Sequence, residues 1–309
     1  MNARTHTAVI VGEALVDIIA ADGVERSVPG GSSLNIAVGL ARLGVHTQLL
    51  AELGDDAAGD LVRSHLAASD VRVDLVARAA STSTAKAKIR ADGSAEYDFR
   101  INWILDGGVS VPASDLLHAG SIGAWLQPGA DRVLEIIRSR GPATLTSFDP
   151  NIRPALISDR ASVAAQIEAL ARESDVVKLS DEDAAWLYPG ESATRVGDHY
   201  LSLGVPLVAI TLGAEGSVVR AAGQTVVQPA APVRVVDTIG AGDAYMSGLL
   251  FALAAGDLLG SVRAGLERDA LHWVAEVASA SARIAVGRQG ADPPRRGELR
   301  AAMRRTQQA

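Results

Sequence analysis

Short apolar runs that alternate with stretches of helical periodicity are the feature that most constrains the fold of this chain. Such runs occur at residues 8–11, 144–148, 176–179 and 206–211. The later runs follow stretches with apolar residues at helical spacing, as at 130–140 and 161–172. Apolar runs without polar alternation are typical of strands buried on both faces of a parallel sheet. The order of elements therefore predicts an α/β fold with a central, mostly parallel sheet flanked by helices.

One region, from Thr82 to Asn102, departs from this rhythm. Two segments of alternating polarity flank Asp92-Gly93, a dipeptide typical of the turn in a β-hairpin. An antiparallel hairpin inside an α/β chain favours a small appendage, although an edge hairpin of the main sheet is the alternative. No internal repeat, low-complexity block or linker divides the chain, so we expect one principal domain.

Composition excludes several classes of protein. With 309 residues, of which 48% are hydrophobic, the chain can bury a large core without covalent crosslinks. It has no cysteine, which excludes disulfides, thiolate metal sites and a cysteine nucleophile, and which fits a cytoplasmic location. The net charge of −7 and the lack of a basic stripe make nucleic acid an improbable partner. Glu13 and Asp17 interrupt the first apolar run, so we expect neither secretion nor membrane insertion.

The segment from Val235 to Asp243 is the strongest indication of chemistry. We interpret Val235-Val236 as the end of a strand, which leads through Gly240 and Gly242 into a helical run. This arrangement aims backbone N–H groups at one point and makes an anion site. A carboxylate there, Asp243, suits phosphoryl transfer, in which a base takes the proton of the attacking hydroxyl. The alternative is an ordinary aspartate at a helix start after a glycine turn.

A second glycine pair, Gly30-Gly31, precedes a helical run that places Ile36, Leu40 and Leu43 on one face. Asn35 lies off that apolar face, in the first turn. Glycines let a ligand approach the backbone closely, so Asn35 is available to such a ligand. Taken alone, this pattern is also typical of a turn followed by a helix.

Together the two segments resemble the two signature segments of the ribokinase-like (PfkB) carbohydrate kinase family. The first comprises Gly30, Gly31, Asn35, Gly39 and Gly44, and the second, roughly two hundred residues later, comprises Asp237-Thr238 and 240–243. The resemblance covers nearly the whole chain and implies a ribokinase-like fold and an ATP-dependent sugar kinase. It also implies one domain, 1–309, with a small β-lid from about 15–28 and 82–102 inserted in it.

The resemblance implies a role for each matching residue. Asp243 is the implied catalytic base, and the backbone of Gly240, Ala241 and Gly242 is the implied anion hole for the transferring phosphoryl group. Asp17, Gly30, Gly31 and Asn35 are implied to contact the sugar. The implied nucleotide contacts are Ser180, Thr211, Gly213, Gly216 and Ser279, and Asp183 is implied to hold Mg²⁺ through water. A tight turn between two strands would explain Gly213 and Gly216 equally well.

Two departures from the family pattern concern the nucleotide side. Ser180-Asp181-Glu182-Asp183 stands where relatives usually have Asn-x-x-Glu, and Ser279 stands where an Asn is frequent.

None of the three lysines, Lys86, Lys88 and Lys178, follows a Walker-type glycine pattern. We therefore expect magnesium, backbone N–H groups and Arg153 to neutralise the phosphates, and the family leaves a monovalent cation such as K⁺ open.

The substrate class follows from two segments. Residues 12–17 and 148–154 look most like fructokinases, which implies fructose as the small-molecule partner; 2-keto-3-deoxygluconate kinase is second, and ribokinase or a nucleoside kinase third. Tyr97 and Phe99 alternate with Asp98, so their rings could cover the apolar side of a sugar, or simply pack the hairpin onto the main domain. Arg153 is assigned either to the nucleotide phosphates or to an acidic substrate. The sequence is compatible with a homodimer. A non-catalytic sugar- or nucleotide-sensing protein is an alternative function, which the presence of Asp243 disfavours.

Overall fold

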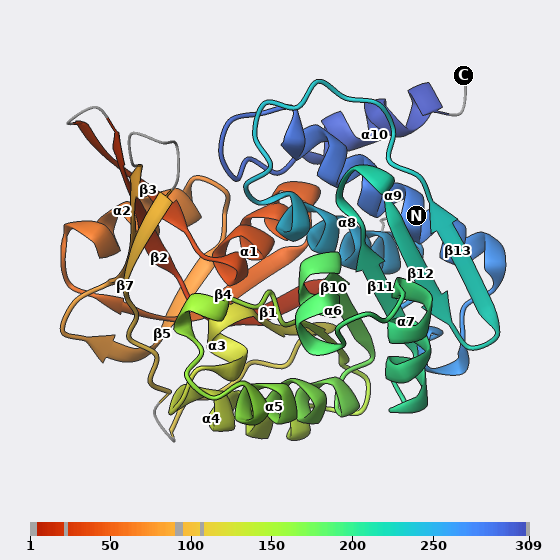
Figure 1. Ribbon diagram of the computed structural model, residues 1–309, viewed down its shortest axis with the longest axis horizontal. Helices are drawn as coiled ribbons and strands as arrows, with labels where there is room; N and C mark the ends of the chain where they lie inside the picture. The colour runs from red at the N-terminus through yellow and green to blue at the C-terminus, as the bar shows by residue number, and fades with distance from the viewer. Residues whose placement is uncertain (1–4, 22–23, 90–94, 106–107, 307–309) are drawn as a thin grey trace.

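A nine-stranded sheet forms the centre of the computed structural model, which describes residues 5–21, 24–89, 95–105 and 108–306 (Figure 1). In spatial order its strands are β13 (Gln224–Gln228), β12 (Ser217–Ala221), β11 (Leu207–Thr211), β10 (Val176–Ser180), β9 (Leu145–Asp149), β8 (Leu116–Gly120), β1 (Thr7–Val11), β4 (His46–Gly54) and β5 (Arg72–Ala79). Every neighbouring pair from β11 to β5 is parallel, whereas the pairs β11–β12 and β12–β13 are antiparallel. The prediction of a mostly parallel sheet is confirmed.

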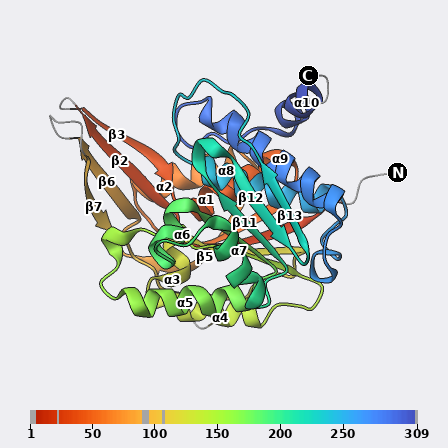
Figure 2. The ribbon, with the colours of Figure 1, turned by 45° about the vertical axis from the view of Figure 1, so that its right-hand side comes forward.

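Helices cover both faces of this sheet, as Figures 1 and 2 show. One face packs against α1 (Ser32–Leu43), α2 (Ala57–Ala67), α8 (Ala241–Ala255), α9 (Arg268–Val286) and α10 (Arg296–Thr306). The other packs against α3 (Ser121–Trp125), α4 (Gly129–Arg138), α5 (Arg160–Arg172), α6 (Asp181–Leu187) and α7 (Ala193–Ser202). The two apolar cores therefore lie on opposite sides of the strands, which explains why residues such as Ile10 and Val11 are both fully buried. Within the described ranges, no helix is long and apolar enough to cross a bilayer.

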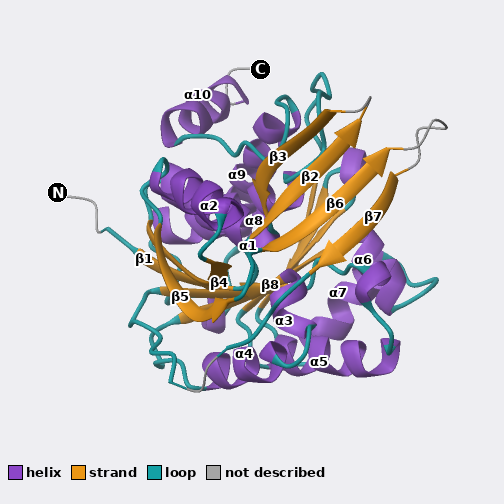
Figure 3. Cartoon of the chain, turned by 90° about the vertical axis from the view of Figure 1, so that its left-hand side faces the viewer, coloured by secondary structure: helices purple, strands orange, loops and turns teal. Residues whose placement is uncertain are grey.

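A second sheet of four strands lies apart from the first and projects away from it in Figure 3. Its strands, in order, are β3 (Val24–Gly30), β2 (Leu15–Ala21), β6 (Ser83–Ile89) and β7 (Ala95–Arg100). The central pair is parallel, and the two outer pairs are antiparallel. The two segments expected to form a lid thus share one sheet, and the hairpin is not an edge of the main sheet. Asp92-Gly93 lies outside the described residues.

The expected strand at Val235-Val236 is wrong. Strand β13 ends at Gln228, and the chain continues as a loop in which Val235 is 61% and Val236 is 55% exposed. Prolines at 229 and 232 explain the difference, because proline cannot donate a hydrogen bond to a strand ladder. The loop is fixed near its end by the N–H of Val236, which donates to the carbonyl of Val286 at 2.9 Å.

Candidate active site

The starts of α1 and α8 meet above the carboxyl ends of the central strands. The two helices lie against each other through small residues: a Cβ atom on Gly39 would lie 2.4 Å from the hydroxyl oxygen of Ser247. Close packing of this kind brings together two helix N-termini, each of which presents unpaired backbone N–H groups. The two glycine-rich segments of the sequence therefore form one site.

Helix α8 begins at a turn that requires glycine. Gly240 has a φ of 74°, and a Cβ atom there would lie 2.6 Å from the Cβ of Ala291. The N–H of Ala241 donates to the carbonyl of Thr238 at 3.2 Å. In the part of the chain that the structure describes, no acceptor pairs with the N–H groups of Gly242 and Asp243. These two donors can bind an anion. The sequence expected an anion hole from Gly240, Ala241 and Gly242, but the N–H of Ala241 is used within the turn.

Asp243 is the third residue of α8 and is only 8% exposed. One carboxylate oxygen accepts a hydrogen bond from the hydroxyl of Ser32 at 2.6 Å, and the other accepts one from the amide of Asn35 at 2.8 Å. A carboxylate offers about four lone-pair sites, so it can still accept a substrate hydroxyl. The sequence predicted Asn35 as a sugar contact, which stays a prediction, and the structure shows that its amide also pairs with Asp243. Ser32 was missed, although it stands at the start of the helix that Gly31 precedes.

Glu13 is a second residue that the sequence interpretation missed. It is 2% exposed, and its carboxyl oxygens accept hydrogen bonds from the N–H of Ser32 at 3.1 Å and of Gly123 at 3.0 Å. Burial raises the pKa of Glu13 to about 7, although these backbone donors oppose the shift. Its position two residues after the end of β1 was the available signal. Glu13 ties the end of β1 to the starts of α1 and α3, and so holds Ser32 in place.

Asp17 reaches the same region from β2. A Cβ atom on Gly30 would lie 2.0 Å from the Oδ2 of Asp17, so this carboxyl group covers Gly30 directly before Gly31 and Ser32. Burial raises the pKa of Asp17 to about 6, and the positive charge of Arg153 opposes that shift. The glycine at 30 is therefore required by the close approach of Asp17.

The register of the four-stranded sheet relates Phe99 to Asp17. Asp17 pairs with Val28 on one side and Ala85 on the other, and Ala85 pairs with Phe99. Residues directly opposite each other in neighbouring strands point to the same face of a sheet. Phe99 and Asp17 thus share one face, while the side chain of Tyr97 lies outside the described part of the structure.

The segment after β9 connects the two sides of the site. Arg153 is exposed and donates to the side-chain oxygen of Asn151 at 2.7 Å. The N–H of Ile152 donates to Asp183 at 2.7 Å, and Asp183 also accepts from the N–H and the hydroxyl of Ser180 at 2.9 and 2.7 Å. Asp183 is 3% exposed and forms, with Ser180, the capping box of α6. These three donors leave about one lone-pair site on its carboxylate.

The expected nucleotide contacts lie at the ends of β10 and β11. Ser180 pairs with Thr211 across these strands, and the loop that follows contains Gly213 with a φ of 53° and Gly216 with a φ of 105°. A Cβ atom on Gly216 would lie 2.0 Å from the carbonyl oxygen of Gln228, so the turn itself requires this glycine. Gly213 faces open space, and Ser279 is half-buried on α9.

Similarity to known proteins agrees with this geometry. The model of the pfkB family carbohydrate kinases matches residues 6–296. A fructokinase of Rhizobium leguminosarum bv. trifolii is 33% identical over 84% of each chain, and a fructokinase of Klebsiella pneumoniae is 32% identical over 80% of this chain and 84% of its own.

Solved structures show the same likeness. Fructokinase from Vibrio cholerae O395, solved with fructose, ADP and a calcium ion, superposes with a TM-score of 0.83 at 25% identity and covers 96% of this chain and 98% of its own. Aminoimidazole riboside kinase from Salmonella enterica, solved with aminoimidazole riboside and an ATP analogue, gives a TM-score of 0.81 at 27% identity and covers 96% and 99%. With its ribokinase-like fold and both glycine-rich segments meeting at Asp243, the chain belongs to the pfkB family of carbohydrate kinases.

Proposed function

We propose that this protein is a fructokinase, which transfers the γ-phosphoryl group of MgATP to a hydroxyl group of fructose. The observation that carries the proposal is the buried carboxylate of Asp243 beside the unpaired N–H groups of Gly242 and of Asp243 itself. A proton acceptor next to an anion hole is what transfer of a phosphoryl group to a hydroxyl needs. The fructokinases of Rhizobium and Klebsiella support fructose as the acceptor.

In the proposed reaction, the sugar hydroxyl donates its proton to Asp243 as its oxygen attacks the γ-phosphorus. A new O–P bond forms, the bond from the γ-phosphorus to the bridging oxygen breaks, and ADP leaves with that electron pair. Ser32 and Asn35 orient the carboxylate toward the hydroxyl. The free N–H groups of Gly242 and Asp243 would bind the oxygens of the transferring group.

We place the sugar between the start of α1 and the four-stranded sheet. Asp17 would accept hydrogen bonds from sugar hydroxyls above the backbone of Gly30 and Gly31, which lies close to it. Phe99 shares a face with Asp17 and would cover an apolar side of the sugar. The sequence assigns Tyr97 the same role, but its side chain lies outside the described residues. The charge of Arg153 lowers the pKa of Asp17, against the effect of burial. We propose that Arg153 contacts either the sugar or the nucleotide phosphates.

We place the nucleotide over the ends of β10 and β11, against Ser180, Thr211, Gly213, Gly216 and Ser279. Among the residues described, no cluster of three or more acidic or histidine side chains could hold a metal ion. Mg²⁺ would therefore be held mainly by the phosphates of ATP, with Asp183 contributing through water, and would neutralise charge on them. K⁺ is a further ion that we would test. We also propose that the enzyme works in the cytoplasm, where ATP is abundant, as a single domain with its lid.

Fructose should give the highest kcat/KM in a screen of acceptors with MgATP. The panel comprises fructose, tagatose, ribose, 2-keto-3-deoxygluconate, adenosine and aminoimidazole riboside, and release of ADP is followed by a coupled assay. A pocket that hydrogen-bonds a substrate hydroxyl rejects an analogue lacking it by ~10⁴–10⁵. The acceptors should therefore separate clearly.

The riboside in this panel tests a specific alternative, because the aminoimidazole riboside kinase of Salmonella superposes nearly as well as the fructokinase of Vibrio cholerae. A preference for the riboside or for 2-keto-3-deoxygluconate would contradict fructose as the substrate. The assignment of the protein as a kinase would still hold. Absence of acceptor-dependent ADP release, with nucleotide binding intact, would instead support a non-catalytic sensor.

Backbone hydrogen exchange should slow in β2, β6 and β7 when fructose binds. We propose that these strands, with β3, form a lid over the sugar that excludes water from the γ-phosphoryl group. Exchange measured by mass spectrometry with and without saturating fructose checks this expectation, and α4, on the opposite face of the main sheet, serves as the internal control. Unchanged exchange in all four strands at saturating sugar would refute a lid.

A further inference from the structure

A buried ion pair lies beneath the start of α8 and has no part in the function proposed so far. Lys178 of β10 is 3% exposed and Asp149 of β9 is fully buried, and the ammonium nitrogen of Lys178 lies 2.9 Å from the Oδ2 of Asp149. Burying two charges costs desolvation energy that their attraction does not always offset. A buried ion pair is thus weak evidence for stability. We therefore looked for a functional reason for the position of Lys178 and Asp149.

The ammonium group stands beside the anion hole. A Cβ atom on Gly242 would lie 3.0 Å from the Nζ of Lys178, closer than to any other atom outside its own helix and its chain neighbours. Gly242 is the second residue of α8, and its own N–H lacks an acceptor in the described ranges. The missing side chain at 242 therefore leaves room for a cation next to two backbone donors, and all three favour the same anionic ligand.

The hydrogen bonds of this pair are incomplete. An ammonium group carries three donors, and in the described structure Lys178 makes a hydrogen bond to Asp149 alone. The second oxygen of Asp149, Oδ1, is buried and has no hydrogen-bond partner among the residues that the structure describes. Buried polar groups in folded proteins are nearly always paired, so exceptions such as these indicate a missing partner. Lys178 can offer its remaining donors to a ligand without losing Asp149.

The charge of Lys178 is maintained despite its burial. Burial alone would lower the pKa of Lys178, but the carboxylates of Asp149, Asp183 and Asp243 outweigh it and hold that pKa above its usual value. The nearby His118 differs, because burial and the charge of Lys178 lower its pKa to about 3 and leave it neutral. Lys178 therefore brings a fixed positive charge to this end of the sheet.

We propose that Lys178 is a catalytic residue, which donates hydrogen bonds to the oxygens of the transferring phosphoryl group, and that Asp149 is the positioning residue that fixes its ammonium group. The inference rests on the phosphoryl transfer proposed above. As the bond to the bridging oxygen breaks and the bond to the sugar oxygen forms, negative charge stays on the phosphoryl oxygens and on the leaving ADP. A fixed cation beside the anion hole stabilises that charge without reorganisation at the moment of reaction.

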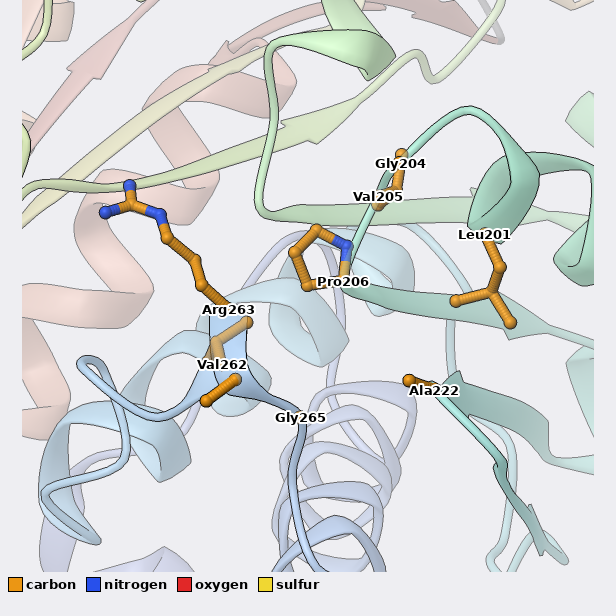
Figure 4. Close-up of a pocket in the computed structure, with 9 residues that line it drawn as sticks. Leu201, Gly204, Val205, Pro206, Ala222, Val262, Arg263 and Gly265 are labelled. Atoms are coloured by element: carbon orange, nitrogen blue, oxygen red, sulfur yellow. The ribbon is translucent and has the colours of Figure 1, made fainter.

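A second buried carboxylate at the other end of the strands shows what a purely structural pair looks like. Arg263 donates to Asp175 at 2.6 Å through Nε and also to the carbonyl of Thr144 at 2.7 Å. Figure 4 shows Arg263 beside a cavity of about 230 Å³ where β11 begins, with Pro206 on its wall. The guanidinium group of Arg263 donates its hydrogen bonds to acceptors of the protein itself. It lies at the ends of these strands opposite to Ser180 and Thr211. Arg263 is thus the matched control for Lys178.

The test compares Lys178→Met, the double variant Lys178→Met with Asp149→Asn, and Arg263→Met. The double variant leaves no unpaired buried carboxylate, so it carries the test if the single variant does not fold. Kinetics use the best acceptor of the wild-type enzyme. Calorimetry measures the affinity for ADP, and for ADP with fluoroaluminate, which mimics the transferring phosphoryl group.

We expect kcat to fall by ~10²–10³ in both Lys178 variants, the usual loss when one preorganised donor to the transition state is removed. The affinity for ADP should stay unchanged, the affinity for ADP with fluoroaluminate should fall, and Arg263→Met should keep its kcat. Retention of more than a tenth of wild-type kcat in a folded Lys178 variant would overturn the proposal, as would equal losses of both affinities. If the wild-type enzyme turns over no acceptor, the proposed function fails, and the two affinities still decide the role of Lys178.

Discussion

Asp243→Asn is expected to lower kcat by ~10²–10⁴, the range typical for loss of a general base, while sparing the fold and the affinity for ADP. The amide has the shape of the carboxylate but cannot take the proton of the sugar hydroxyl. Its oxygen can still accept from Asn35, and its N–H can donate to the hydroxyl of Ser32, which accepts as readily as it donates. Both contacts that position residue 243 are therefore kept.

Steady-state turnover of fructose and calorimetric binding of ADP check this result. Asp131→Asn is the matched control, because Asp131 is the third residue of α4, as Asp243 is of α8, and lies exposed away from the site. The control should keep wild-type kcat. If Asp243→Asn retains more than about a tenth of wild-type kcat, Asp243 is not the base.

Gly242→Val is expected to reduce kcat by ~10²–10³ in a protein that still folds. The new Cβ would lie 3.0 Å from the Nζ of Lys178, and its two methyl groups would fill the space in which phosphate must approach the backbone. The backbone of Gly242 itself needs no left-handed conformation, since its φ is not positive. The loss should therefore appear in turnover rather than in folding.

Gly297→Val controls for the substitution itself. Gly297 is the second residue of α10, and nothing lies within 4 Å of a Cβ atom built there. Valine in a helix lowers the free energy of unfolding by less than ~1 kcal/mol relative to alanine. Both variants should therefore have similar melting temperatures. Normal turnover in folded Gly242→Val would show that this turn does not hold the phosphoryl group.

The main sheet could be predicted because its strands are buried on both faces. Runs such as 176–179 lack the polar alternation of a solvent-facing strand, and the structure places β10 there. The same criterion failed at Val235-Val236, where the apolar side chains lie on an exposed loop after two prolines. Apolar character alone does not distinguish a buried strand from a loop that presents valines to solvent.

The site was predictable where its chemistry is local. Gly240 and Asp243 stand within one turn of a helix start, and a sequence pattern records such spacing. The partners of Asp243 come from α1, and Lys178 comes from a strand whose neighbour supplies Asp149. The periodicity of apolar residues does not indicate contacts between residues so far apart in the sequence. Lys178 was set aside because it follows no glycine motif, although a lysine within an apolar strand is itself unusual. The homodimer and the cytoplasmic location stay predictions.

The hydrogen bond from Ser32 to Asp243 spans 211 residues of chain, which makes the order of synthesis matter. The N-terminal part of a chain leaves the ribosome first, so α1 is present well before α8. Closing so long a loop costs little more free energy than closing one half as long, but such distant contacts form slowly. Until Gly240 and the helix after it have docked on α1, the nascent chain lacks the carboxylate that we propose as the base. We therefore expect phosphoryl transfer only from a chain in which both helices are in place.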